Sequence, residues 1–156
     1  MNKSNLEIRN NHLLTYGYVM LILFLTLSGF GQMPIFKRYY VADIPGFGWL
    51  AEFFVTHYIH YLAAILFLAV AAYLIADYLL TTNRNIRVTP SGQLRIGLLT
   101  GIALTGGLLV VRNLSGTRFS SGLIIFLDIS HLGLVILFLG VSLVCLLLKK
   151  RWTKRL

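Results

Sequence analysis

Residues 53–76, FFVTHYIHYLAAILFLAVAAYLIA, decide the fold of this chain. The stretch contains no Asp, Glu, Lys or Arg, and it is longer than the roughly 20 residues that an apolar helix needs to cross about 30 Å of hydrocarbon. His57 and His60 are the two imidazoles within it. The stretch therefore predicts a membrane-spanning helix that carries two ionisable side chains at depth, where such groups are costly and usually have a function.

The composition of the whole chain agrees with a membrane protein. Of its 156 residues, 57% are hydrophobic and only 12% are charged, and the mean hydropathy is +0.78. A chain of this composition lacks the polar surface that a soluble domain needs. We therefore expect an integral membrane protein with no separate soluble domain, so any chemistry on a soluble substrate would come from a partner chain.

One further apolar run precedes this stretch and two follow it. Together they predict an all-α, integral membrane four-helix bundle that forms a single domain over residues 1–156. Polar residues 81–93, TTNRNIRVTPSGQ, are predicted to form an inner loop, and residues 39–49 an outer loop or a short surface helix. The predicted spans cover residues 13–33, 51–79, 95–112 and 121–148.

Basic residues collect at the ends of the apolar runs. The net charge of +9 could suggest nucleic-acid binding, but this distribution is typical of membrane topology signals. With the first span leading outward, most of the basic residues fall inside, which predicts both termini in the cytoplasm of a multi-pass membrane protein. The inner residues are Lys3, Arg9, Arg84, Arg87, Arg95, Lys149, Lys150, Arg151, Lys154 and Arg155, and the outer residues are Lys37, Arg38, Arg112 and Arg118.

His60 and His131 are the candidate ligands of a shared cofactor. If their helices begin at Trp49 and Ser120, each histidine lies about eleven residues, or about 16 Å, from the outer end of its helix. Two neutral imidazoles at one membrane level are typical ligands of six-coordinate haem iron. The alternative is that each histidine is a hydrogen-bonded core residue.

Other polar residues lie near this level. His57 is one turn outward of His60 and could hold a haem propionate, line a quinol site or replace His60 as the ligand. Asp128 stands in the same relation to His131, where a carboxylate could orient the imidazole or accept protons. Arg112 and Arg118 could pair with propionates or act as interfacial anchors.

The inner half of the chain holds two further candidates. His12 opens the first span, and Cys145, the only cysteine, follows His131 by 14 residues. Because 14 residues turn a helix through nearly four full turns, the two side chains share a face about 21 Å apart. Cys145 could ligate a second haem or could be a small hydrophobic core residue.

Short motifs along most of the chain resemble a known family. Arg9-x-x-His12 with Leu27-Ser28-Gly29, the segment Ile59-His60-Tyr61-Leu62-Ala63-Ala64, and His131 resemble motifs in the cytochrome b (gamma) subunits of membrane-bound formate dehydrogenases and nickel-iron hydrogenases. That family has four core spans, inner termini and two b haems. This chain differs in two places: Cys145 stands where the family has an inner histidine, and His12 lies about one turn early.

The resemblance implies a haem b-containing subunit of a respiratory redox complex. Such a subunit transfers electrons between a partner redox subunit, carrying iron-sulfur clusters or several haems, and the membrane quinone. His60 and His131 would hold one haem. A second haem would have His12 as a ligand and would need Cys145 as the other. The chain itself shows no motif for independent substrate chemistry. It would be the electron-transfer subunit of an oxidoreductase complex.

Two other functions are compatible with the same residues. A haem-free anchor would hold a redox or enzymatic partner to the membrane and use its histidines only as hydrogen-bonding core residues. A small transporter or metal channel would use His57, His60, Asp128 and His131, although the sequence lacks the repeats and broken helices common in transporters.

Overall fold

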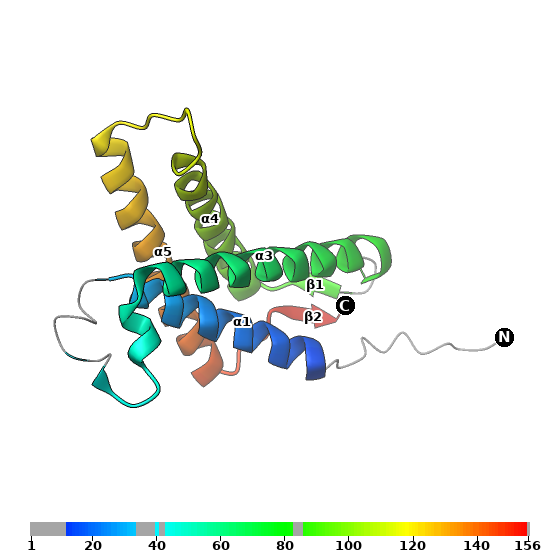
Figure 1. Cartoon of the computed structure of the whole chain (residues 1–156). Helices are drawn as coiled ribbons and strands as arrows, with labels where there is room; N and C mark the ends of the chain where they lie inside the picture. Colours follow the sequence, from blue (N-terminus) through cyan, green and yellow to red (C-terminus); the bar gives the residue numbers. More distant parts are fainter. Residues whose placement is uncertain (1–11, 34–39, 41–42, 83–85, 156) are drawn as a thin grey trace. The chain divides into compact units, whose positions relative to one another are not determined.

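The computed structural model describes residues 12–33, 40, 43–82 and 86–155. Four long helices dominate this part of the chain: α1 (His12–Gly31), α3 (Phe53–Asp77), α4 (Pro90–Arg112) and α5 (Ser121–Leu147) (Figure 1). Three helical stretches, Phe53–Leu80, Pro90–Arg112 and Ser121–Leu147, are long and apolar enough to cross a membrane. In α1, the apolar stretch Tyr16–Gly31 is shorter than these three. These helices support the prediction of a mostly helical membrane protein.

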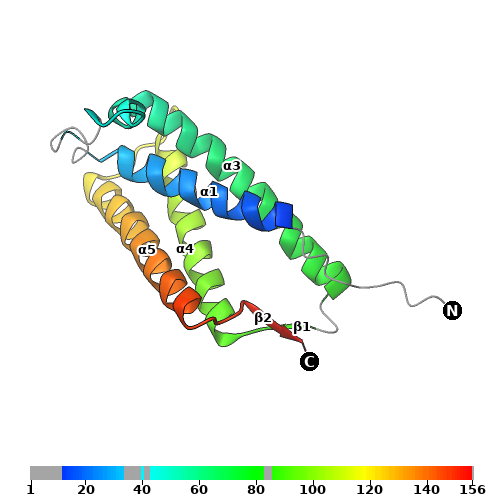
Figure 2. The ribbon, with the colours of Figure 1, turned by 90° about the horizontal axis from the view of Figure 1, so that it is seen from below.

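The chain divides into two compact units, Met1–Thr81 and Thr82–Leu156. In the first unit α1 packs along α3, and in the second α4 packs along α5 (Figure 2). Each unit is therefore a helical hairpin. The core of the first unit includes the fully buried Leu50, Thr56 and Ser28. In the second unit, Leu127 and Phe138 of α5 are buried.

The start of α3 lies later than the sequence suggests. Gly48–Ala51 forms a separate 3₁₀ helix, η2, at the end of the segment 39–49 that the sequence predicts to be a loop or a short surface helix. Glu52 then caps the N-terminus of α3 with an extended backbone, and α3 begins at Phe53. Trp49 therefore belongs to η2 rather than to the membrane helix.

The predicted inner loop, residues 81–93, is largely ordered secondary structure. Tyr78–Thr82 continues α3 as a π-helical segment, and Ile86–Val88 forms strand β1. Helix α4 starts at Pro90 instead of residue 95. Pro90 occupies the first helical turn, and the Thr89 hydroxyl accepts a hydrogen bond from the Gly92 N–H at 3.0 Å. Proline at the start and threonine at the N-cap are favoured there, so they extend the helix instead of ending it.

The C-terminal tail folds back on the second unit. Strand β2 (Thr153–Arg155) pairs antiparallel with β1, a ribbon that an all-α prediction does not include. The Arg95 guanidinium lies 4.0 Å from the centre of the Trp152 ring and donates to the carbonyls of Ser91 and Lys150 at 3.0 and 3.3 Å. Trp152 thus covers a buried cation.

Candidate functional site

His60 is held by the hydroxyl of Ser28 on the neighbouring helix. The distance from His60 Nδ1 to Ser28 Oγ is 3.0 Å. Ser28 itself is fully buried, with 0% exposure. Its hydroxyl donates to the carbonyl of Phe24 at 2.6 Å. His60 is therefore oriented by α1, within the first unit.

His131 is held in the same way within the second unit. The distance from His131 Nδ1 to Thr105 Oγ1 is 3.0 Å, the same as in the first unit. The Thr105 hydroxyl donates to the carbonyl of Gly101 at 2.8 Å, four residues back along α4. Both histidines therefore contact a hydroxyl on the first helix of their hairpin.

The hydrogen bonds of each pair are satisfied together in one tautomer of the imidazole. A hydroxyl has one hydrogen, and both Ser28 and Thr105 lie within hydrogen-bond distance of a backbone carbonyl, which can only accept. If Nδ1 carries the ring hydrogen, each hydroxyl can donate to its carbonyl and accept from Nδ1–H. The lone pair of a neutral ring is then on Nε2. Fixing the Nδ1–H this way is how proteins orient histidines that ligate a metal through Nε2.

A glycine beside each hydroxyl lets the imidazole approach the first helix. A Cβ atom added at Gly29 would lie 3.2 Å from His60 Cε1, and one added at Gly106 would lie 3.1 Å from His131 Cε1. Either distance is tighter than ordinary van der Waals contact. A larger side chain at either position would push the ring away from its hydroxyl partner.

The two histidines do not stand equally far from the first residues of their own helices, although the sequence suggests that they do. His60 follows the first residue of α3 by seven residues, and His131 follows the first residue of α5 by ten. At about 1.5 Å per residue the distances from the helix starts differ by roughly 5 Å. The difference arises because Trp49 belongs to η2, which lies beyond the end of α3.

A second polar pair lies one helical turn from each histidine, toward the N-terminus of α3 or α5. In the first unit, His57 Nδ1 is 3.2 Å from Gln32 Oε1. In the second unit, Arg112 forms a salt bridge with Asp128 at 3.4 Å. At His131 the group beside Nδ1 is the Thr105 hydroxyl, and Asp128 pairs with Arg112. That Asp128 orients His131 or accepts protons stays a prediction.

The remaining predicted site residues lie apart from these pairs. Arg118 is exposed between α4 and α5. Cys145 is a free thiol with 6% exposure, buried near the C-terminal end of α5. His12 is the first residue of α1, and its side chain lies outside the described part of the structure.

The sequence contained a signal for the hydroxyl and glycine positions. Both α1 and α4 contain a leucine, a hydroxyl residue and a glycine in this order. The two segments are Leu27-Ser28-Gly29 and Leu104-Thr105-Gly106. The GxxxG spacing of Gly97 and Gly101 is less informative. A Cβ at Gly101 would lie 3.2 Å from Leu134, whereas one at Gly97 would meet nothing within 4 Å.

Across the described residues, no three His, Cys, Asp or Glu side chains gather into a group that could hold a metal ion. A haem requires less from the protein, because the macrocycle supplies four ligands and the chain needs to supply only the axial ones. Each hairpin offers one imidazole that is held through Nδ1, which is the donor type that such an axial position takes.

Comparisons with known proteins add no family assignment. Neither the family models, nor the curated proteins, nor the solved structures contain a match to this chain.

Proposed function

We propose that this chain is a haem b-containing membrane subunit that passes electrons between a partner redox subunit and the membrane quinone. The observation that carries the proposal is the repeated arrangement of histidine, hydroxyl and glycine in the two hairpins. A core histidine that only needs a hydrogen bond could have a different partner in each hairpin. A haem held by two histidines needs both rings in the same tautomer, and the repeated arrangement provides for this.

One b haem is proposed, with His60 of the first unit and His131 of the second as axial ligands through Nε2. When bound, the haem carries one electron at a time between its ferric and ferrous states. Ser28 and Thr105 would accept the Nδ1–H of each ligand and fix the orientation of its ring. Gly29 and Gly106 leave room for the rings beside α1 and α4. His12 and Cys145 remain predictions for a second haem.

The proposed topology is a four-helix bundle with both termini in the cytoplasm. The charge distribution of the chain supports this orientation. Such a bundle would place the histidines in the outer half of the membrane. The partner, an iron-sulfur or multihaem cytochrome subunit, would supply the substrate chemistry. The membrane would be the cytoplasmic membrane of a bacterium or archaeon.

Arg112 and Arg118 were predicted to pair with haem propionates. The Arg112 guanidinium already has a carboxylate partner, Asp128, so its charge is partly compensated. Arg118, which is exposed, is therefore the stronger of the two candidates for a propionate contact in this proposal.

The second candidate function is a haem-free anchor for a redox or enzymatic partner. The hydrogen bonds to Ser28 and Thr105 satisfy one nitrogen of each imidazole and would serve this function as well. A pyridine haemochrome assay on the purified full chain separates the two. The electron-transfer subunit should contain about one b haem per chain. A colourless protein that still assembles with its partner would favour the anchor.

A further inference from the structure

The backbone of the C-terminal segment is held against the start of α4 (Figure 2). The Thr89 N–H donates to the Trp152 carbonyl at 2.9 Å, and the Thr89 hydroxyl donates to the Arg151 carbonyl at 2.8 Å. A Cβ atom added at Gly92 would collide with the Trp152 carbonyl, so only glycine permits this approach. The carbonyls make these contacts, whereas the side chains of Lys150 and Arg151 are exposed.

The β1–β2 ribbon presents two cations on one of its faces. Arg87 and Lys154 are directly opposite each other, so their side chains project from the same face of the ribbon. Both side chains are exposed. The neighbouring Val88 projects from the other face, where its Cγ1 would lie 2.9 Å from a Cβ atom at Gly92. The face with the two cations is therefore directed away from α4.

The two like charges oppose the pairing of the strands. Directly opposite residues have Cβ atoms about 5 Å apart, and like charges in such a pair are destabilising. Asp128 is the only acidic residue in the sequence from residue 82 to 156. It pairs with Arg112, the last residue of α4, roughly 30 Å along the helix from the ribbon. An anion from outside the chain would remove this repulsion.

A third cation occupies a position that usually holds glycine. Lys149 comes directly after the C-cap of α5 and has a φ of 52°. Its N–H donates to the Leu146 carbonyl at 3.0 Å, and the Lys150 N–H donates to the Cys145 carbonyl at 2.8 Å, which together form a Schellman motif. Left-handed backbone is unfavourable for a residue with a Cβ atom. The exposed Lys149 thus adds charge beside Lys150 where the backbone favours glycine.

Exposed apolar side chains adjoin these cations. Leu94, near the start of α4, is 53% exposed, and Leu146 and Leu147, at the end of α5, are each 73% exposed. Both helices are long and apolar enough to cross a membrane. A phospholipid combines acyl chains with a phosphate. Its chains can therefore lie along the two helices while its phosphate meets the cations.

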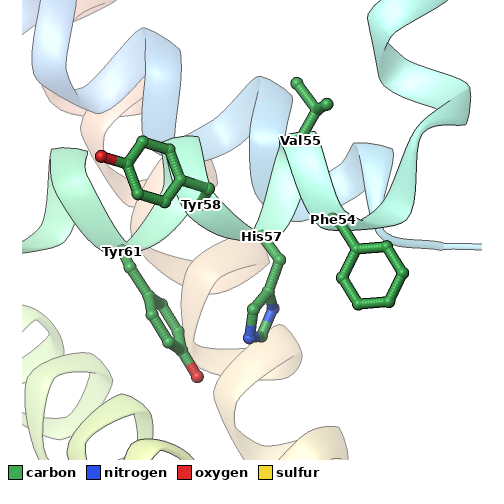
Figure 3. Close-up of a pocket in the computed structure, with 5 residues that line it drawn as sticks. All are labelled: Phe54, Val55, His57, Tyr58 and Tyr61. Atoms are coloured by element: carbon green, nitrogen blue, oxygen red, sulfur yellow. The ribbon is translucent and has the colours of Figure 1, made fainter.

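The exposed surface at the start of α3 has a different chemistry. Phe54, Val55, His57, Tyr58 and Tyr61 line it, and none of them is a lysine or an arginine. Figure 3 shows His57 and Tyr61 projecting to one side of α3 and Val55 to the other. Such a surface can contact acyl chains, but it has no permanent charge that would select one phospholipid head group over another. The cations distinguish the ribbon from this surface.

We propose that the cations at the β1–β2 ribbon bind the phosphate of an anionic phospholipid head group. These cations, which we call the basic surface, are Arg87, Lys149, Lys150, Arg151 and Lys154. Arginine and lysine side chains both bind phosphate oxygens by charge-assisted hydrogen bonds. The phosphate offsets the repulsion between the two strands. The proposal does not depend on a bound haem.

The test measures which phospholipid lies beside Trp152. The full chain with Trp49→Phe is reconstituted in phosphatidylcholine vesicles, so that Trp152, which directly precedes β2, is the only tryptophan. Its fluorescence is quenched by phosphatidylglycerol or phosphatidylcholine that carries a nitroxide on an acyl chain close to the head group. Phosphatidylglycerol should bind at least about tenfold more strongly, since each cation near a membrane surface contributes about fivefold in affinity. Equal binding of the two lipids would overturn the inference.

Charge variants test whether the ribbon is responsible. Arg87→Gln combined with Lys154→Gln should reduce the preference for phosphatidylglycerol at least about fivefold. The exchange of Arg87→Lys with Lys154→Arg keeps both charges and should retain the preference. Lys37→Gln with Arg38→Gln is the matched control, because it removes one lysine and one arginine between α1 and η2 in the sequence and should leave the preference unchanged. An equal loss in both glutamine variants would overturn the inference, because total charge would then attract the lipid.

An acidic protein surface and free phosphate are the competing occupants of the basic surface. Poly-L-glutamate and inorganic phosphate are therefore added separately to the same chain in phosphatidylcholine vesicles, and the Trp152 emission is recorded. A shift with either anion, in a chain that shows no preference for phosphatidylglycerol, would overturn the lipid assignment and identify the competing occupant.

Discussion

The two hairpins share a contact between a histidine and a hydroxyl. They differ in a second polar pair, which lies one turn closer to the N-terminus of α3 or α5. In both hairpins a histidine on the second helix contacts a hydroxyl on the first at 3.0 Å, with a glycine beside it. In the first hairpin the second pair is His57 with Gln32, and in the other hairpin it is the ion pair of Arg112 with Asp128. The shared contact is consistent with equivalent roles for the two histidines, whereas the second polar pair is an imidazole with an amide in one hairpin and an ion pair in the other.

The largest effect is expected from filling the space beside the imidazoles. Gly29→Val and Gly106→Val place a branched side chain where a single Cβ already lies 3.2 or 3.1 Å from the ring. Overpacking of this kind costs roughly 1–3 kcal/mol and should displace the histidine. We expect haem content to fall at least about tenfold in either variant.

Gly107→Val is the matched control for Gly106→Val. A Cβ at Gly107 meets nothing within 4 Å, although the residue is next in sequence and on the same helix. Equal haem loss in the two valine variants would show that helix distortion, rather than crowding of His131, is responsible.

Removing the hydroxyls should have the next largest effect. Ser28→Ala and Thr105→Val remove the hydroxyl that lies 3.0 Å from Nδ1 of a half-buried imidazole, and the loss of such a hydrogen bond costs roughly 1 kcal/mol. Haem affinity should fall about 10–100-fold, as is typical when a group that orients a metal ligand is lost. The affinity is measured by titrating haem into the apoprotein.

The conservative exchange Thr105→Ser retains the hydroxyl and should restore most of this affinity. Haem binding that is as weak in Thr105→Ser as in Thr105→Val would indicate that packing of the threonine methyl group, and not the hydrogen bond, matters at this position.

A smaller effect is expected where α4 begins and the C-terminal segment packs against it. Trp152→Ala removes the ring that lies 4.0 Å from the Arg95 guanidinium, and cation–π contacts of this kind contribute about 0.5–2 kcal/mol. The variant should unfold more easily in a denaturant titration and keep its haem. Loss of haem in this variant would mean that the C-terminal ribbon is coupled to the histidine site.

The smallest effect is expected at the ion pair. Arg112 and Asp128 are 30% and 53% exposed, so solvent screens their attraction, and such pairs contribute at most about 1 kcal/mol. Asp128→Asn should therefore change stability little and leave haem content unchanged. A double-mutant cycle with Arg112→Gln measures the coupling, and haem loss in Asp128→Asn would give the carboxylate a role at His131.

Apolar runs predicted the helices well because membrane spans are decided by composition over about 20 residues. The start of α4 was placed too late, since Pro90 and Gly92 resemble loop residues until the Thr89 cap is recognised. The β1–β2 ribbon could not be foreseen, because its strands are three residues long and are separated by two helices. Pairing over such a separation leaves no periodic pattern in the sequence.

At the candidate site the sequence indicated the histidines but not their partners. His60 and His131 stood out because imidazoles are rare in apolar helices. Ser28 and Thr105 did not, because small hydroxyl residues are common in membrane helices and can bond their own backbone. Only the packing of each helix pair shows that the hydroxyl faces a histidine. The same is true of Gln32 and His57.

The most direct test of the central claim is haem content in three alanine variants. If each hairpin supplies one axial ligand, His60→Ala and His131→Ala should each abolish the reduced b-type spectrum of the purified protein, and His57→Ala should retain it. The account would be contradicted if either His60→Ala or His131→Ala kept the wild-type spectrum, or if His57→Ala lost its haem.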